Sequence, residues 1–206
     1  SVPGTAAVTG VAKEKKMLPS SLKVVAVAGS LRRASFNRLL LRSAIFLAPQ
    51  GMVIEELDIH AIPLFNQDLE EEGPPQSVIA FKESVAAADG LLIVTPEYNY
   101  GIPAVTKNLI DWASRASTHP GNVLLDKPVS IMAISSSSRG RGPKARSHVR
   151  EVLVFPRAIP MPSGDVGLSG GLSNFDGHGN LIDEAARTQV EQNLVEFATW
   201  IRKLSG

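Results

Sequence analysis

Short, uninterrupted apolar runs alternate with amphipathic stretches from about residue 22 to the end of the chain, and this alternation constrains the fold most. Apolar runs of this length are typical of strands that are buried on both faces of a sheet. Each run is followed by a stretch whose apolar residues recur at helical spacing. Repeated strand–helix units predict a parallel sheet between two layers of helices.

The predicted strands are about 23–28, 52–58, 90–95, 128–134 and 157–161, and the predicted helices about 36–48, 75–88, 103–116, 143–153 and 183–204. Between the last strand and the last helix, residues 163–180 are rich in glycine but precede no helix at the spacing of a nucleotide loop. We expect a solvent-exposed linker there. The predicted fold is α/β: one domain over residues 21–206, a three-layer sandwich on a five-stranded parallel sheet.

Residues 1–20 differ from the rest because they are small and polar and lack a sustained apolar core. They do not have the pattern of a secretory signal. We expect a flexible arm or a processing remnant. A cleaved transit peptide, with an organellar location, is the alternative, since the chain starts at Ser1.

Composition excludes several classes of function. The net charge of +1 gives no electrostatic reason for binding nucleic acid or anionic membranes, and no run approaches the roughly 18 apolar residues of a membrane helix. The chain has no cysteine, and its four histidines are scattered over separate segments. We therefore predict no disulfide, no metal site and no acid–base or nucleophilic machinery. We expect a cytoplasmic protein with a small-molecule partner.

A polar loop follows the first predicted strand and leads into a helix. Its polar residues are Ser30, Arg32, Arg33, Ser35 and Asn37, directly after Gly29. A helix N-terminus presents unpaired N–H groups and a partial positive charge, and hydroxyls, an amide and a guanidinium can add donors. The loop therefore suggests a phosphorylated ligand, although an ordinary turn with a helix cap is the alternative.

Comparison with known phosphate-binding loops argues against two kinds of nucleotide site for residues 29–37. A Walker loop needs a Gly-Lys-Ser/Thr sequence, and this loop has no such lysine. A Rossmann turn needs three spaced glycines after the first strand, and here Gly29 stands alone. ATP hydrolysis and a Rossmann dinucleotide fold are therefore not favoured.

A second polar loop follows the third predicted strand. It reads Pro96-Glu97-Tyr98-Asn99-Tyr100, and Lys-Asn-x-x-Asp-Trp at 107–112 follows on the next helix. Taken with Gly-Ser-Leu-Arg-x-x-Ser-x-Asn at 29–37, this sequence resembles the NAD(P)H-dependent FMN reductase family over residues 22–204. The resemblance implies a flavodoxin-like fold with bound FMN, and NADPH or NADH as the electron donor.

The resemblance also implies roles for the loops. Ser30, Arg32, Ser35 and Asn37 would hold the FMN phosphate, and Pro96, Glu97, Tyr98, Asn99 and Tyr100 would border the isoalloxazine ring. Glu97 could instead cap a helix or pair within a dimer. Ser135 and Ser136 would donate hydrogen bonds to the ring from the loop after the fourth strand.

The loop after the fourth strand departs from the family pattern, which commonly has several glycines there. Here residues 135–138 are serines, and Gly140 and Gly142 remain. A serine carries a Cβ, which puts close approach of the backbone to the ring in question. Arg139, Arg141 and Lys144 add charge, which mildly favours NADPH over NADH.

The predicted function is that of an FMN-dependent oxidoreductase. Electrons would pass from NAD(P)H through FMN to a quinone, an azo dye, a metal oxyanion or free flavin by a ping-pong mechanism. The cofactor carries the chemistry, so no catalytic side chain is predicted. The alternatives are an FMN-binding electron-transfer module that NAD(P)H does not reduce, and a flavin-free α/β protein that binds a phosphate ligand.

A homodimer or homotetramer is expected. In the resembling family the second and third helices pack across a two-fold axis, and here they carry Phe81 and the pair Asp111 and Trp112. A symmetric dimer is also the commonest oligomer. The alternative is that Trp112 fills the core of the monomer, since its helical register with Leu109 allows that.

Overall fold

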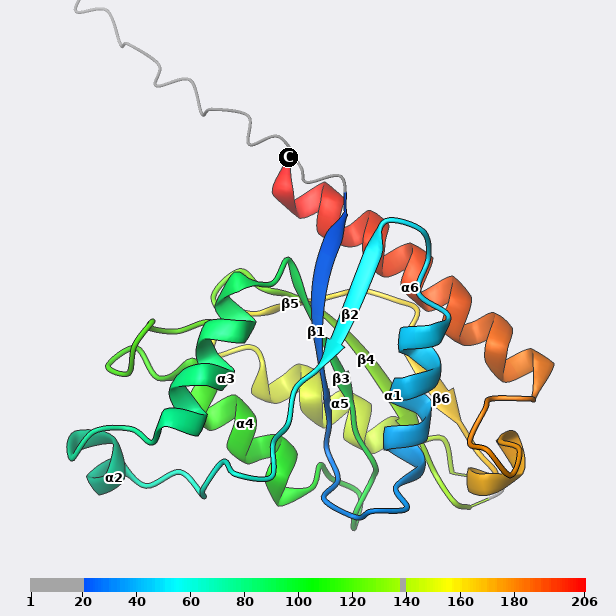
Figure 1. The fold of residues 1–206 in the computed structure, drawn as a ribbon, viewed down its shortest axis with the longest axis horizontal. Helices are drawn as coiled ribbons and strands as arrows, with labels where there is room; N and C mark the ends of the chain where they lie inside the picture. Colours follow the sequence, from blue (N-terminus) through cyan, green and yellow to red (C-terminus); the bar gives the residue numbers. More distant parts are fainter. Residues whose placement is uncertain (1–20, 138–139) are drawn as a thin grey trace, which may run out of the picture.

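The computed structural model describes residues 21–137 and 140–206 (Figure 1). The predicted arm at 1–20 and the predicted role of Arg139 lie outside the described residues. The strands are β1 (Leu22–Ala28), β2 (Met52–Glu56), β3 (Gly90–Val94), β4 (Pro128–Ile134), β5 (Ile159–Pro160) and β6 (Val166–Leu168). The helices are α1 (Phe36–Phe46), α2 (Gln67–Glu71), α3 (Gln76–Ala87), α4 (Ala104–Ser114), α5 (Pro143–Val152), α6 (Glu184–Ser205) and the 3-10 helix η1 (Gly171–Asn174).

All strand pairs in the sheet are parallel, in the order β2-β1-β3-β4-β5, and β6 also pairs with β4. Val25 in β1 lies opposite Glu55 in β2 and Leu91 in β3. β2 lies on one side of β1 in the sheet and β3 lies on the other side. The direction in which successive strands are added therefore reverses at β1. In sheets of this kind, ligands bind at the carboxyl ends of the strands beside such a reversal.

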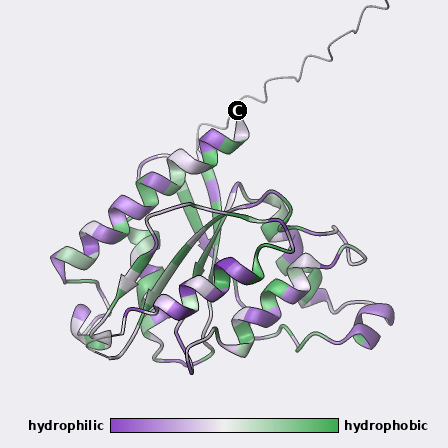
Figure 2. Cartoon of the chain, turned by 180° about the vertical axis from the view of Figure 1, so that it is seen from behind, coloured by the Kyte–Doolittle hydropathy of each residue, from purple (hydrophilic) through white to green (hydrophobic). Residues whose placement is uncertain are grey.

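Two hydrophobic clusters, one on each face of the sheet, stabilise the sandwich. Alternate residues of β1 separate onto the two faces: Val24 and Ala26 pack with α1 and α6, whereas Val25 and Val27 pack with α3, α4 and α5. Figure 2 shows apolar colours on the strands and polar colours on the outward faces of the helices. The burial pattern explains why the strands read as continuous apolar runs, since both faces are covered.

The predicted flavodoxin-like fold is confirmed, with differences in detail. The sheet has a sixth strand, because Val166–Leu168 is buried beside β4 within the segment that was expected to be an exposed linker. The same segment contains η1. A short helix, α2, occupies part of the region after β2 where only turns were expected.

Trp112 lies inside the monomer. Its side chain is fully buried, its ring meets Phe65 edge-on at 4.9 Å between centroids, and its Nε1 donates to the carbonyl oxygen of Pro63 at 2.9 Å. Phe81 is also buried, in the cluster under α3 and α4. The expectation that Trp112 and Phe81 mark a subunit interface was therefore wrong, and the alternative, a core position, holds for both.

Candidate functional site

A cavity of about 350 Å³ opens at the carboxyl ends of β1, β3 and β4. It is lined by Ser30, Arg32, Ser35, Phe36, Asn37, Pro96, Glu97, Tyr98, Ile134, Ser135 and Ser136. Residues from three separate loops of the sequence thus meet around one space. Of the residues predicted for the site, all but Asn99 and Tyr100 line it.

The loop between β1 and α1 supplies hydrogen-bond donors to this cavity. Ser35 is the N-cap of α1, and its hydroxyl oxygen accepts the backbone N–H of Arg38 at 3.4 Å. The hydroxyl oxygen of Ser30 accepts the N–H of Arg32 at 3.4 Å in the same way. Because both oxygens already act as acceptors, the O–H hydrogens are left to donate to an anion. The Arg32 guanidinium lies over the Phe36 ring, 4.8 Å from its centroid.

Asn37 is buried and joins α1 to the end of β4. Its Oδ1 accepts the N–H of Ile134, and its Nδ2 donates to the carbonyl oxygen of the same residue, both at 3.1 Å. The amide therefore holds the first and fourth strand loops together. One hydrogen on Nδ2 is left for the contact with a phosphate that the sequence predicts.

Tyr98 and Gly101 close a two-residue turn at the edge of the cavity. Each donates its backbone N–H to the carbonyl oxygen of the other, at 3.0 and 2.9 Å. The two residues between them, Asn99 and Tyr100, have φ angles of 51° and 64°, as tight hairpin turns require. This turn carries Asn99 and Tyr100 to an exposed tip, away from the cavity lining.

Glu97 caps the helix on the opposite side of the cavity. One of its carboxylate oxygens accepts the backbone N–H groups of Lys144 at 2.8 Å and Ala145 at 3.0 Å, in the first turn of α5. The capping alternative for Glu97 is thus observed, although the residue also lines the cavity. A negative charge is favourable at a helix N-terminus, and here it joins the loop after β3 to the loop after β4.

The serine loop after β4 rests on the segment that follows β6. Ser135 donates its N–H to Leu168 and accepts the N–H of Gly171, at 3.0 and 2.9 Å. A Cβ on Gly171, whose φ is 50°, would lie 3.0 Å from the Phe36 ring and from Cα of Ser136. Glycine is therefore favoured at position 171, where the backbone lies against Phe36 and Ser136 of the cavity lining. The sequence signal for this close approach is the pair Gly170-Gly171, which lies within the segment predicted to be an exposed linker.

The Lys-Asn-x-x-Asp-Trp motif on α4 holds the segment after β2. Asn108 accepts the N–H of Phe65 at 2.7 Å and donates to the carbonyl oxygen of Pro63 at 2.8 Å. Glu70 accepts hydrogen bonds from Arg115 nearby, at 2.9 and 3.0 Å from Nε. The motif therefore fixes this segment against α4 and does not line the cavity.

Within residues 21–137 and 140–206, we find no group of three or more His, Cys, Asp or Glu side chains that could hold a metal ion. Over the same residues, no helix is both long and apolar enough to cross a membrane.

Comparison with known proteins gives consistent matches over nearly the whole chain. The family model described as NADPH-dependent FMN reductase matches residues 22–172. An NAD(P)H-dependent FMN reductase of Pseudomonas aeruginosa is 41% identical over 189 residues, which cover 92% of this chain and 100% of that protein. An NADPH:quinone oxidoreductase of Arabidopsis thaliana is 38% identical over 191 residues, covering 90% and 94%.

A solved structure also resembles this fold. FerB, a flavoenzyme NAD(P)H:(acceptor) oxidoreductase from Paracoccus denitrificans, superposes with a TM-score of 0.80 at 27% sequence identity. The match covers 88% of this chain and 98% of the other.

Proposed function

Because the chain belongs to the NADPH-dependent FMN reductase family and is an oxidoreductase that uses FMN and NAD(P)H, we propose that its cavity holds FMN for the reduction of a quinone. The phosphate would be bound by Ser30, Arg32, Ser35 and the N-terminus of α1. The isoalloxazine ring would lie between the loops at 96–98 and 135–136.

The observation that carries this proposal is the hydrogen bonding of the Ser30 and Ser35 hydroxyl groups. Ser30 and Ser35 both line the cavity beside Arg32, and both accept a backbone N–H group, which leaves their O–H groups able to donate to a bound anion. Such a set of donors at a helix N-terminus fits a phosphate dianion and does not fit a cation. The residues present therefore fit FMN.

Bound FMN supplies the redox chemistry, since it can take hydride from NAD(P)H and pass the electrons to an acceptor. The protein would hold FMN in position and control the access of substrates to it. Tyr98 lines the cavity and is about half exposed, so the cavity borders solvent there. A single site for both substrates supports a ping-pong order, in which NAD(P)H leaves before the quinone enters. Azo dyes, metal oxyanions and free flavin are further proposed acceptors for the same site.

Steady-state kinetics test this function. FMN-loaded protein should oxidise NADPH or NADH in the presence of a quinone, and double-reciprocal plots at several quinone concentrations should give parallel lines. Intersecting lines would mean that both substrates are bound together and would contradict the single site. A yellow protein that neither donor reduces would instead be an electron-transfer module, and a colourless one would be a flavin-free protein.

A homodimer or homotetramer and a cytoplasmic location are also part of the proposal. Symmetric dimers are the commonest oligomers, and a small-molecule acceptor requires no partner macromolecule. The exposed apolar side chains of the monomer, among them Phe46, Leu64 and Phe155, offer surface that a second copy could cover.

A further inference from the structure

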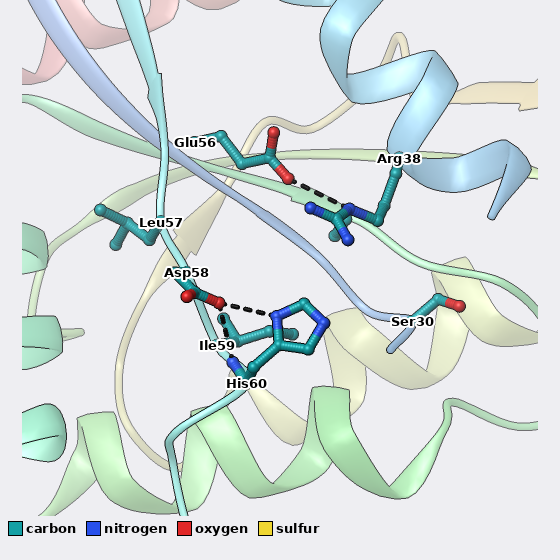
Figure 3. A pocket seen from close by; sticks show the side chains of 8 residues that line it. Ser30, Arg38, Glu56, Leu57, Asp58, Ile59 and His60 are labelled. Carbon is teal, nitrogen blue, oxygen red and sulfur yellow. Dashed lines mark hydrogen bonds and ion pairs between the residues drawn. The ribbon is translucent and has the colours of Figure 1, made fainter. Parts of the chain in front are cut away.

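A second cavity of about 350 Å³ lies beside the proposed FMN cavity, at the carboxyl ends of β1 and β2 (Figure 3). It is lined by Ala28, Ser30, Arg38, Glu56, Leu57, Asp58, Ile59 and His60. Ser30 lines both cavities, so the loop that is proposed to hold the FMN phosphate separates them. A volume of this size is within the range of small-molecule sites, which is about 300–1,000 Å³.

One ion pair and one hydrogen-bonded histidine–aspartate pair line this second cavity. Nε of Arg38 lies 3.4 Å from a carboxylate oxygen of Glu56, and both side chains are about a quarter exposed. Nδ1 of His60 lies 2.7 Å from Oδ1 of Asp58, and the backbone N–H of His60 donates to the same oxygen at 3.0 Å. Figure 3 shows the far edge of the imidazole ring directed toward Ser30. The pairing uses one imidazole nitrogen and leaves Nε2 for a ligand.

This combination suits a ribose that carries hydroxyls or a phosphate. The Glu56 and Asp58 carboxylates can accept hydrogen bonds from ribose hydroxyls. Arg38 can donate to a phosphate, and Nε2 of His60 accepts from a hydroxyl in the neutral ring and donates to a phosphate in the protonated ring. Ala28, Leu57 and Ile59 add an apolar wall that a purine ring could contact. In Rossmann dinucleotide folds, an acidic residue binds the ribose 2′-hydroxyl and a nearby arginine accommodates a 2′-phosphate, so these residue types are known to recognise this part of a dinucleotide.

Ser30 lines both cavities, so an electron donor longer than FMN could reach from the first cavity into the second. FMN is a mononucleotide, and it would extend from the ring site to the Ser30 loop. NAD(P)H joins two nucleotides. If the nicotinamide of NAD(P)H lies on the flavin ring and the rest of the molecule runs along FMN, its adenosine lies beyond the Ser30 loop. The second cavity opens there.

We propose that the second cavity binds the adenosine ribose of the electron donor, and that Arg38 and Glu56 set the choice between NADPH and NADH. Arg38 would donate to the 2′-phosphate of NADPH, and the protonated His60 ring would add a second donor. The Glu56 carboxylate would repel that phosphate and would accept a hydrogen bond from the 2′-hydroxyl of NADH. This inference rests on the proposed function, and it offers an alternative to the expectation that Arg139, Arg141 and Lys144 favour NADPH.

Donor selectivity in matched variants tests the inference. The ratio of kcat/KM for NADPH to that for NADH should fall at least tenfold in Arg38→Gln, and it should rise several-fold in Glu56→Gln. Arg38→Lys keeps the charge and should retain most of the ratio of the wild type. Arg42→Gln, one helical turn further along α1 and outside this cavity, is the control that should leave the ratio unchanged.

A binding measurement separates this inference from the proposed function. Calorimetry with adenosine 2′,5′-bisphosphate should show binding to the wild type and at least tenfold weaker binding to Arg38→Gln, whether or not the protein turns over NAD(P)H. Equal binding by the two proteins would overturn the inference while leaving reductase activity intact. A change of donor ratio in Lys144→Gln but not in Arg38→Gln would also overturn it.

Discussion

Arg32 brings a full positive charge to the cavity at the start of α1, and its contact with the Phe36 ring fixes its direction. A charge-assisted contact contributes roughly 1.5–3 kcal/mol. We therefore predict that Arg32→Ala weakens FMN binding about ten- to a hundred-fold and changes riboflavin binding little. Fluorescence titration of the apoprotein with both flavins measures this difference.

Arg33 is the matched control, since it is exposed and does not line the cavity. Arg33→Ala should bind FMN like the wild type. Equal affinities of the wild type for FMN and riboflavin would contradict the phosphate assignment altogether.

Glu97 joins two elements that are far apart in the sequence, the loop after β3 and the first turn of α5. Removing a helix cap costs about 1–2 kcal/mol. We predict that Glu97→Ala lowers the free energy of unfolding of the apoprotein by that amount and also weakens FMN binding, because the two loops then separate. Glu97→Gln, which keeps an acceptor oxygen, should lie between Ala and the wild type.

Urea denaturation of the apoproteins and flavin titration measure the two effects. Excess FMN should widen the stability difference between Glu97→Ala and the wild type, because the variant binds FMN more weakly and gains less stability from it. An alanine variant as stable as the wild type would show that α5 does not depend on this cap.

Glu70 stabilises the segment after β2 in a pH-dependent way. Hydrogen bonds from Arg115, with those of Ser117 and Thr118, lower the pKa of Glu70 from 4.5 to about 2 even though burial opposes this shift. The carboxylate therefore contributes stability that is complete above about pH 5 and is lost as the pH falls through 2. A shift of this size corresponds to about 3 kcal/mol.

We predict that Glu70→Gln is less stable than the wild type at pH 7 by an amount of that order, and that the difference narrows steadily from pH 5 toward pH 2. Chemical denaturation at a series of pH values measures it. A constant difference in stability over that range would contradict the lowered pKa of Glu70 in the folded protein.

At the scale of the whole molecule, the oligomer is the main open prediction. Trp112 and Phe81 are internal, so an interface must use other surface, and Phe46, Leu64 and Phe155 are each more than 70% exposed. We predict at least a dimer in light scattering at micromolar concentration. Phe155→Ser and Phe46→Ser, on different parts of the surface, should identify the interface by which of them shifts the mass toward one chain. A single-chain mass for the wild type would refute the dimer.

The fold class and most of the cavity lining could be predicted from patterns within short stretches of sequence. Apolar runs that are buried on both faces must lie in a covered parallel sheet, and Ser30, Arg32 and Ser35 follow β1 where a helix N-terminus has to form. These inferences depend on residues close together in the chain. Local spacing was enough to place them, and the 96–98 and 135–136 loops could be added because parallel strands end at the same edge of the sheet.

Tertiary structure alone decided the contacts between distant segments. Asn37 reaches Ile134, Glu97 reaches Lys144, and Gly171 lies behind Ser136. Nothing in the local sequence fixes which of these segments meet, because each pairing depends on strand order and on how the helices pack over the sheet. The second cavity is of the same kind, since it exists only where α1 brings Arg38 to the end of β2.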